Sequence, residues 1–183
     1  YVKEEAMGGI RVMNDYILFP SDRDGHMHLY LYNIDGRFIR QIEKGKYDVD
    51  EVYGFDETTG KTYFQAAAKT PMQREIYVAD KNGKVTCLTT KDGWNSAVFS
   101  GDYKYFLNNW SDRNSPYSYA IYNNKGHIVR EVLNNDALIK DMAKYDLPTR
   151  DFFKFTTSEG VQLNGWIVKP KNFDPNKKYP VIF

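Results

Sequence analysis

The sequence has only one cysteine, Cys87, among its 183 residues, which excludes an internal disulfide and any metal site built from several cysteines. It also lacks an excess of charge of either sign. With 25 basic and 24 acidic side chains the formal net charge is +1, so no overall field favours nucleic acid or an acidic membrane surface. The sequence shows no signal peptide and no apolar run long enough to span a bilayer. The chain begins on strand-like sequence and ends within the apolar run 181–183, so we expect it to be a piece of a longer protein.

Aromatic side chains, by contrast, are abundant: they make up 16% of the chain and include 15 Tyr and 11 Phe. Such residues suit the half-buried, pleated surface of a sheet. Three stretches share one pattern, in which an apolar strand with period-two alternation leads into a polar turn closed by glycine and then a second strand. These stretches are HLYLYNIDGRFIRQI (28–42), REIYVADKNGKVTCLT (74–89) and SYAIYNNKGHIVREV (118–132). We interpret them as three copies of one hairpin.

The turn glycines give the repeat its register, and they recur at intervals of roughly 40–50 residues, the length of a four-stranded propeller blade. Five positions before each glycine stands an apolar residue, which we expect to face inward at equivalent places of three blades. The glycines are Gly36, Gly83 and Gly126, and the apolar residues are Leu31, Val78 and Ile121. Further strands are expected over 11–13, 16–19, 52–55, 61–67, 94–99 and 103–109, with 110–115 as a loop.

The pattern changes at Asn134. Possible N-cap residues precede apolar residues at helical spacing, and Pro148 ends the pattern, so we predict a helix of roughly three turns. A hairpin over 152–168 and a buried strand over 179–183 are expected to follow. The predicted domains are therefore 1–134, a partial β-propeller of about three blades, and 135–183, a linker helix with the beginning of another domain.

Residues with possible chemistry are few. Two aspartates and two histidines near residue 25 suggest metal ligands, but the further oxygen ligands of a calcium loop do not follow, and we interpret the segment as a turn. Ser100 and Ser111 fall in predicted turns. The histidines fall at strand edges with no obvious acid partner, whereas a serine nucleophile needs a base and an orienting group. We predict no catalytic, cofactor-binding or metal-binding residue. The residues considered besides the serines are Asp22, Asp24, His26, His28 and His127.

The last 50 residues resemble a known junction. The segments 163–166 (LNGW), 169–170 (KP), 172–174 (NFD) and 177–181 (KKYPV) are similar to the point at which dipeptidyl peptidase IV-type serine peptidases, of the prolyl oligopeptidase kind, leave an eight-bladed propeller for an α/β-hydrolase domain. The stretches SDRDGHMHLYLYNIDG, QREIYVADKNGKVTCLT and AVFSGDYKYF resemble the last blades of that family, and LNNDALIKDMAKYDLP resembles its linker helix. Tyr47 departs from the pattern, because many relatives carry tryptophan there.

The resemblance implies a mainly β fold: antiparallel four-strand blades of a partial propeller, one short helix, then a β-hairpin and the first strand of an α/β-hydrolase domain. It also implies a parent hydrolase that removes N-terminal dipeptides, often after Pro or Ala, through a Ser-His-Asp triad with the serine in a Gly-x-Ser-x-Gly turn. The family also holds the substrate amino group with a glutamate pair and assists the oxyanion with a tyrosine. This chain has no Gly-x-Ser-x-Gly, and its acidic pair Glu4-Glu5 lacks the family's flanking residues.

Two functions of different class remain open. The first is the non-catalytic, access-limiting propeller part of a dipeptidyl peptidase, inactive by itself. The second is a free-standing propeller used for protein interaction. The resemblance implies a peptide substrate and a homodimer for the parent, no cofactor, no nucleic acid, and a periplasmic, cell-surface or secreted location.

Overall fold

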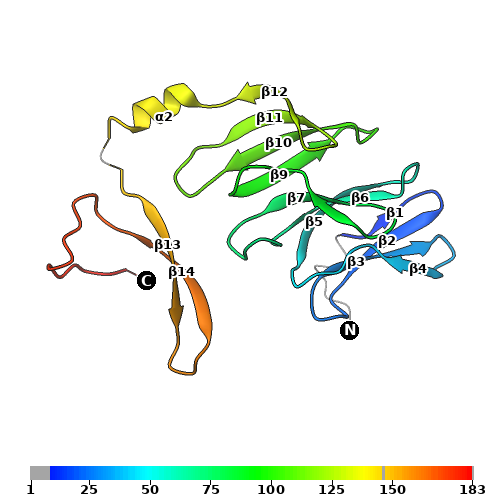
Figure 1. Cartoon of the computed structure of the whole chain (residues 1–183), viewed down its shortest axis with the longest axis horizontal. Coiled ribbons are helices and arrows are strands. Elements are labelled where there is room, and N and C mark those ends of the chain that lie inside the picture. Colours follow the sequence, from blue (N-terminus) through cyan, green and yellow to red (C-terminus); the bar gives the residue numbers. More distant parts are fainter. Residues whose placement is uncertain (1–8, 146, 183) are drawn as a thin grey trace. The chain divides into compact units, whose positions relative to one another are not determined.

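Short antiparallel strands make up most of the fold, as three four-stranded sheets and a separate two-stranded hairpin (Figure 1). The computed structural model describes residues 9–145 and 147–182. The chain divides into two compact units. The first comprises Tyr1–Asp112 and Tyr117–Asn134, and the second comprises Arg113–Pro116 and Asn135–Phe183.

The three sheets of the first unit are meanders, in which each strand pairs with the next one along the chain. The first sheet holds β1 (Arg11–Val12), β2 (Tyr16–Ser21), β3 (His28–Asn33) and β4 (Phe38–Gln41). The second holds β5 (Val49–Asp56), β6 (Lys61–Ala66), β7 (Glu75–Ala79) and β8 (Val85–Cys87). The third holds β9 (Trp94–Phe99), β10 (Tyr105–Ser111), β11 (Ser118–Asn123) and β12 (Ile128–Leu133). The predicted mainly β fold of four-strand antiparallel blades is confirmed.

The turn between the third and fourth strands has the same hydrogen bonds in every sheet. In the second sheet the backbone N–H of Lys84 donates to Asp80 Oδ1 at 3.0 Å, and the N–H of Gly83 donates to the Asp80 carbonyl at 3.0 Å. The place of Asp80 is taken in the other two sheets by Asn33 and Asn123. The three turn glycines have φ of +82°, +84° and +82°, a conformation that favours glycine. The glycine register of the sequence is thus a repeated turn geometry.

The apolar core lies between neighbouring sheets and forms two clusters. One cluster joins the first and second sheets through Leu18, Leu29, Leu31, Ile42, Val49, Val52, Phe55, Phe64, Ala66, Tyr77 and Ala79. The other joins the second and third sheets through Tyr63, Ile76, Val78, Leu88, Phe106 and Tyr122. Because the second sheet contributes to both clusters, every residue of its strand β7 is buried.

The expected equivalence of Leu31, Val78 and Ile121 is confirmed at the level of strand register. Each lies in the third strand of its sheet and pairs with an apolar or aromatic residue of the second strand, Leu18, Tyr63 and Leu107 respectively. The first two are buried, and Ile121 is half-buried.

The second unit contains α2 (Asp136–Met142), β13 (Arg150–Thr156) and β14 (Gln162–Val168). The two strands pair in continuous antiparallel register from Arg150 opposite Val168 to Thr156 opposite Gln162. Neither strand has a buried residue.

The predicted helix is shorter than expected. It has 7 residues, Asp136–Met142, and Tyr145 lies beyond it. Asn135 stands at the N-cap with φ of 60°, its side chain makes no capping hydrogen bond, and no helical residue is buried. Without a side-chain cap or a buried face, little stabilises further turns.

Two strand predictions and one loop prediction are also wrong in part. Tyr103 precedes β10 and lies in a turn with φ of 52°, because its N–H donates to the Ser100 carbonyl at 2.9 Å. Trp110 and Ser111 belong to β10 rather than to the predicted loop. The strand expected over 179–183 is absent from its described part, where Ile182 is 98% exposed, since no described strand pairs with it.

Candidate functional site

A buried histidine–glutamate pair connects β3 to the segment that follows β4. His28 Nδ1 lies 2.9 Å and 3.0 Å from the two carboxylate oxygens of Glu43, and the backbone N–H of Leu29 donates to Glu43 Oε1 at 3.3 Å. The two side chains are only 3% and 1% exposed. The expectation that His28 has no acid partner is therefore wrong. It failed because the partner lies on another strand end and is brought close only by the fold.

Aromatic rings enclose this pair. The ring of Tyr47 meets that of His28 edge-on at 6.2 Å and stacks on Tyr77 at 6.5 Å. Burial raises the pKa of the Tyr47 hydroxyl, and the negative charge of Glu43 raises it further. Tyr47, the position that departs from the resemblance, thus packs against the buried pair. Because both side chains are almost fully buried, the pair fixes the segment after β4 to β3.

The other predicted positions have local structural roles. His26 Nδ1 lies 3.5 Å from Asp48 Oδ1, so this histidine also has an acid neighbour. Asp24 Oδ2 accepts a hydrogen bond from the Tyr30 hydroxyl at 2.6 Å. Asp22 lies in the turn before His26, and His127 is exposed beside the turn glycine of the third sheet. Within 9–145 and 147–182, no group of three or more His, Cys, Asp or Glu side chains could hold a metal ion.

The serines belong to turns and strand ends. Ser100 Oγ donates to Asp102 Oδ1 at 2.7 Å and accepts the N–H of Tyr105 at 3.1 Å. Hydrogen bonds from Ser100 and Lys104 lower the pKa of Asp102 to about 2. Ser111 ends β10, and Ser158 lies in the turn between β13 and β14. Among the described residues none of these three serines hydrogen-bonds to a histidine. Glu4-Glu5 lies outside the described residues.

Arg74 connects the second sheet, to which it and Asp50 belong, with Trp94 of the third sheet. Arg74 Nε lies 2.7 Å from Asp50 Oδ2, and the guanidinium lies over the ring of Trp94 at 5.1 Å. Burial raises the pKa of Asp50, and the charge of Arg74 opposes that shift. The main chain of Arg74 bonds to both sides of Trp94, because its N–H donates to Gly93 and its carbonyl accepts from Asn95, each at 2.9 Å. These contacts fix the two sheets to each other.

One open cavity of about 740 Å³ lies where turns of the second and third sheets meet β1. Its lining carries charges of both signs, with Arg11 and Lys104 beside Asp56, Glu57 and Asp102. The carboxylates of Asp56 and Asp102 accept hydrogen bonds within their own turns. The cavity therefore offers no concentration of one charge for a ligand.

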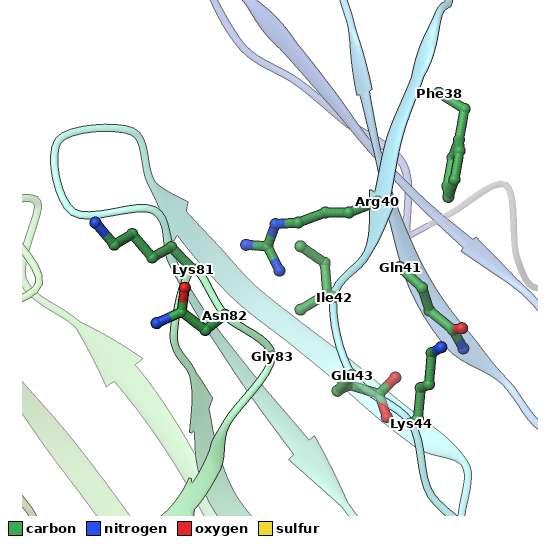
Figure 2. Close-up of a pocket in the computed structure, with 9 residues that line it drawn as sticks. All are labelled: Phe38, Arg40, Gln41, Ile42, Glu43, Lys44, Lys81, Asn82 and Gly83. Carbon is green, nitrogen blue, oxygen red and sulfur yellow. The ribbon is translucent and has the colours of Figure 1, made fainter.

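A second cavity, of about 560 Å³, has a more uniform charge and lies between β4 and the β7–β8 turn (Figure 2). Three cationic side chains line it, Arg40, Lys44 and Lys81, with Glu43 as the one carboxylate. In Figure 2 the guanidinium of Arg40 extends from β4 toward Asn82. Arg40 Nη2 donates to the Gly60 carbonyl at 3.2 Å. Sequence reasoning missed this groove, because its two sides come from different sheets.

None of the helices in the described part of the chain is long and apolar enough to cross a membrane.

The chain is similar to proteins of one known family. Residues 4–117 match the family model for the dipeptidyl peptidase IV (DPP IV) N-terminal region. Over 174 residues the chain is 32% identical to dipeptidyl peptidase 4 of Arthroderma otae and 30% identical to that of Trichophyton rubrum, covering in both cases 92% of this chain and 22% of the relative.

Solved structures agree in fold. The crystal structure of Porphyromonas gingivalis dipeptidyl peptidase 4 matches with a TM-score of 0.93 and 33% identity, over 98% of this chain and 26% of that one. A putative dipeptidyl aminopeptidase IV from Bacteroides ovatus has the same fold with a TM-score of 0.74 at 22% identity, over 91% of this chain and 26% of that one. The chain thus spans about a quarter of the length of the proteins that it matches. It belongs to the dipeptidyl peptidase IV family.

Proposed function

We propose that this chain is the non-catalytic propeller part of a serine-type dipeptidyl peptidase, which removes N-terminal dipeptides from peptides, often after Pro or Ala. The family match over residues 4–117 to the N-terminal region carries the proposal. In this role the sheets shape the route by which a peptide reaches the active site of the parent enzyme. The parent acts as a homodimer in the periplasm, at the cell surface or after secretion.

The polar contacts of the first unit support a structural role for these sheets. The pair of His28 and Glu43 is enclosed. Arg74 pairs with Asp50 of its own sheet and lies over the ring of Trp94 in the third sheet. A Ser-His-Asp triad works as a unit, so a chain without one has no partial activity to retain.

The test compares the 183-residue chain with the full-length parent. We expect the chain neither to release the chromophore of a Gly-Pro substrate nor to react with a fluorophosphonate serine probe, whereas the parent does both. Labelling of the chain at Ser100, Ser111 or Ser158, mapped by mass spectrometry, would overturn the proposal.

The alternative function is a free-standing interaction module. The gene sequence that follows the codon for Phe183 distinguishes the two functions. A Gly-x-Ser-x-Gly motif followed by an aspartate and a histidine supports the peptidase, and the absence of such a motif supports the interaction module.

A further inference from the structure

The groove between β4 and the β7–β8 turn carries charges that the packing of the sheets does not account for. One side is formed by Phe38, Arg40, Gln41, Ile42, Glu43 and Lys44, and the other by Lys81, Asn82 and Gly83. Its volume of about 560 Å³ lies within the range of small-molecule sites. Figure 2 shows that Arg40 and the Lys81–Gly83 turn face each other across it.

The one carboxylate that lines the groove can balance only one of its three positive charges. Glu43 is 1% exposed, and both of its oxygens are occupied by His28, with the N–H of Leu29 as a further donor. Lys44 and Lys81 are exposed. The groove therefore presents positive charge to solvent.

Arg40 is held incompletely. Its Nη2 makes one hydrogen bond, to the Gly60 carbonyl, whereas Nη1 is buried and makes none among the described residues. Burial lowers the pKa of Arg40. The negative charge of Asp80 raises it, but by less than burial lowers it. A guanidinium donor without an acceptor is costly, and a charged oxygen acceptor relieves that cost best.

We propose that this groove binds a small anion with two or more negatively charged oxygens, of the carboxylate or phosphate class. Arg40 supplies the planar donor pair that matches a carboxylate or phosphate. Lys81 supplies a point charge and the side-chain amide of Asn82 a further donor from the opposite turn, while Gln41 and Lys44 line the groove from the segment of β4. Because the groove spans two sheets, a bound anion joins β4 to the β7–β8 turn.

The experiment measures binding to the whole 183-residue chain by backbone and side-chain amide NMR at constant ionic strength. The probes are citrate for the carboxylate source, pyrophosphate for the phosphate source, and acetate as the monovalent control. We expect saturable shifts at Gly83 and at the amides of Gln41 and Asn82 with citrate, pyrophosphate or both, and none with acetate. The stronger of the two multivalent probes identifies the source.

Variants distinguish specific anion binding in the groove from a general effect of ions on exposed charges. Arg40→Gln is expected to weaken binding about tenfold, the effect of losing a hydrogen bond to a charged group. If that variant fails to fold, Lys44→Gln with Lys81→Gln provides a second test, because both side chains are exposed. Arg37→Gln is the matched control, since Arg37 is an exposed arginine of the same hairpin outside the groove. Equal shifts with all three anions, or equal affinity in the groove variants and the Arg37 control, would overturn the proposal.

Discussion

The β7–β8 hairpin of the first unit and the β13–β14 hairpin of the second are closed by the same kind of turn. Gly83 and Gly160 have φ of +84° and +81°. In each turn the side-chain oxygen of the residue three positions before the glycine accepts a hydrogen bond from the N–H of the residue that follows the glycine. The accepting oxygen belongs to Asp80 in the first hairpin and to Thr157 in the second. Local sequence is enough to specify this turn in either place.

The two hairpins differ in what covers them. Every residue of β7 is buried, between the two core clusters, whereas every residue of β13 is exposed. A two-stranded hairpin is at best marginally stable without packing against further structure. Local chemistry therefore sets the shape of both hairpins, and burial between sheets supplies the stability of the first.

The largest effect is expected from removing a core ring. Phe64 is fully buried in the cluster between the first and second sheets, so Phe64→Ala should lower the free energy of unfolding by about 3–5 kcal/mol. Phe155 of β13 is 45% exposed, and Phe155→Ala should cost about 1 kcal/mol or less. Urea denaturation followed by circular dichroism measures both. Similar losses in the two variants would contradict the comparison.

The turn glycines give the next largest effect. An added Cβ at Gly126 would lie 2.7 Å from the Leu88 carbonyl oxygen, whereas Gly36 and Gly160 have no atom within 4 Å. All three have φ near +80°. Alanine at the two open positions should therefore cost only the backbone penalty of roughly 1–2 kcal/mol. Gly126→Ala should cost about 1–3 kcal/mol more, because the third sheet must move away from Leu88.

Urea midpoints of these three variants, compared with the unmodified chain, separate the two costs. Gly36→Ala is the control within the first unit, and Gly160→Ala is the control in the exposed hairpin. If Gly126→Ala cost no more than Gly36→Ala, the close approach to Leu88 would carry no energetic weight.

The strands and turns could be predicted from sequence because their signals are local. Alternating apolar residues, an Asn or Asp, and a glycine three positions later are enough to place each of the three repeated hairpins. The helix was predicted too long. The spacing of apolar residues after Asn134 does not show whether the Asn135 side chain caps the helix or whether one helix face is buried.

Contacts between sheets could not be predicted in the same way. Arg40 reaches the Gly60 carbonyl, and the Tyr53 hydroxyl accepts the N–H of Ala97 from another sheet. The candidate groove depends on how two sheets pack, as does the enclosure of the buried pair. No pattern within one hairpin carries that information.

The smallest effect concerns two carboxylates in opposite surroundings. Glu75, in the buried strand β7, has its pKa raised above the ordinary value of 4.5, first by burial, while Lys69 at 3.9 Å and the Tyr77 hydroxyl oppose the shift. As pH rises past 4.5, the unfolded chain releases this proton before the folded chain does, so stability falls with rising pH. Glu75→Gln should remove that slope. The measurement is the urea midpoint as a function of pH.

Asp102, on an exposed turn, is the matched control with the opposite sign. Its pKa is lowered to about 2, so its contribution to stability is present above the unfolded value of 3.8 and is lost as pH falls toward 2. Asp102→Asn should therefore lower stability above about pH 4 by a constant amount and change the slope of the profile only between about pH 2 and pH 4, whereas Glu75→Gln changes the slope only above about pH 4.5. A Glu75→Gln profile parallel to that of the unmodified chain above pH 4.5 would mean that burial in β7 leaves this carboxylate as solvated as one on a turn.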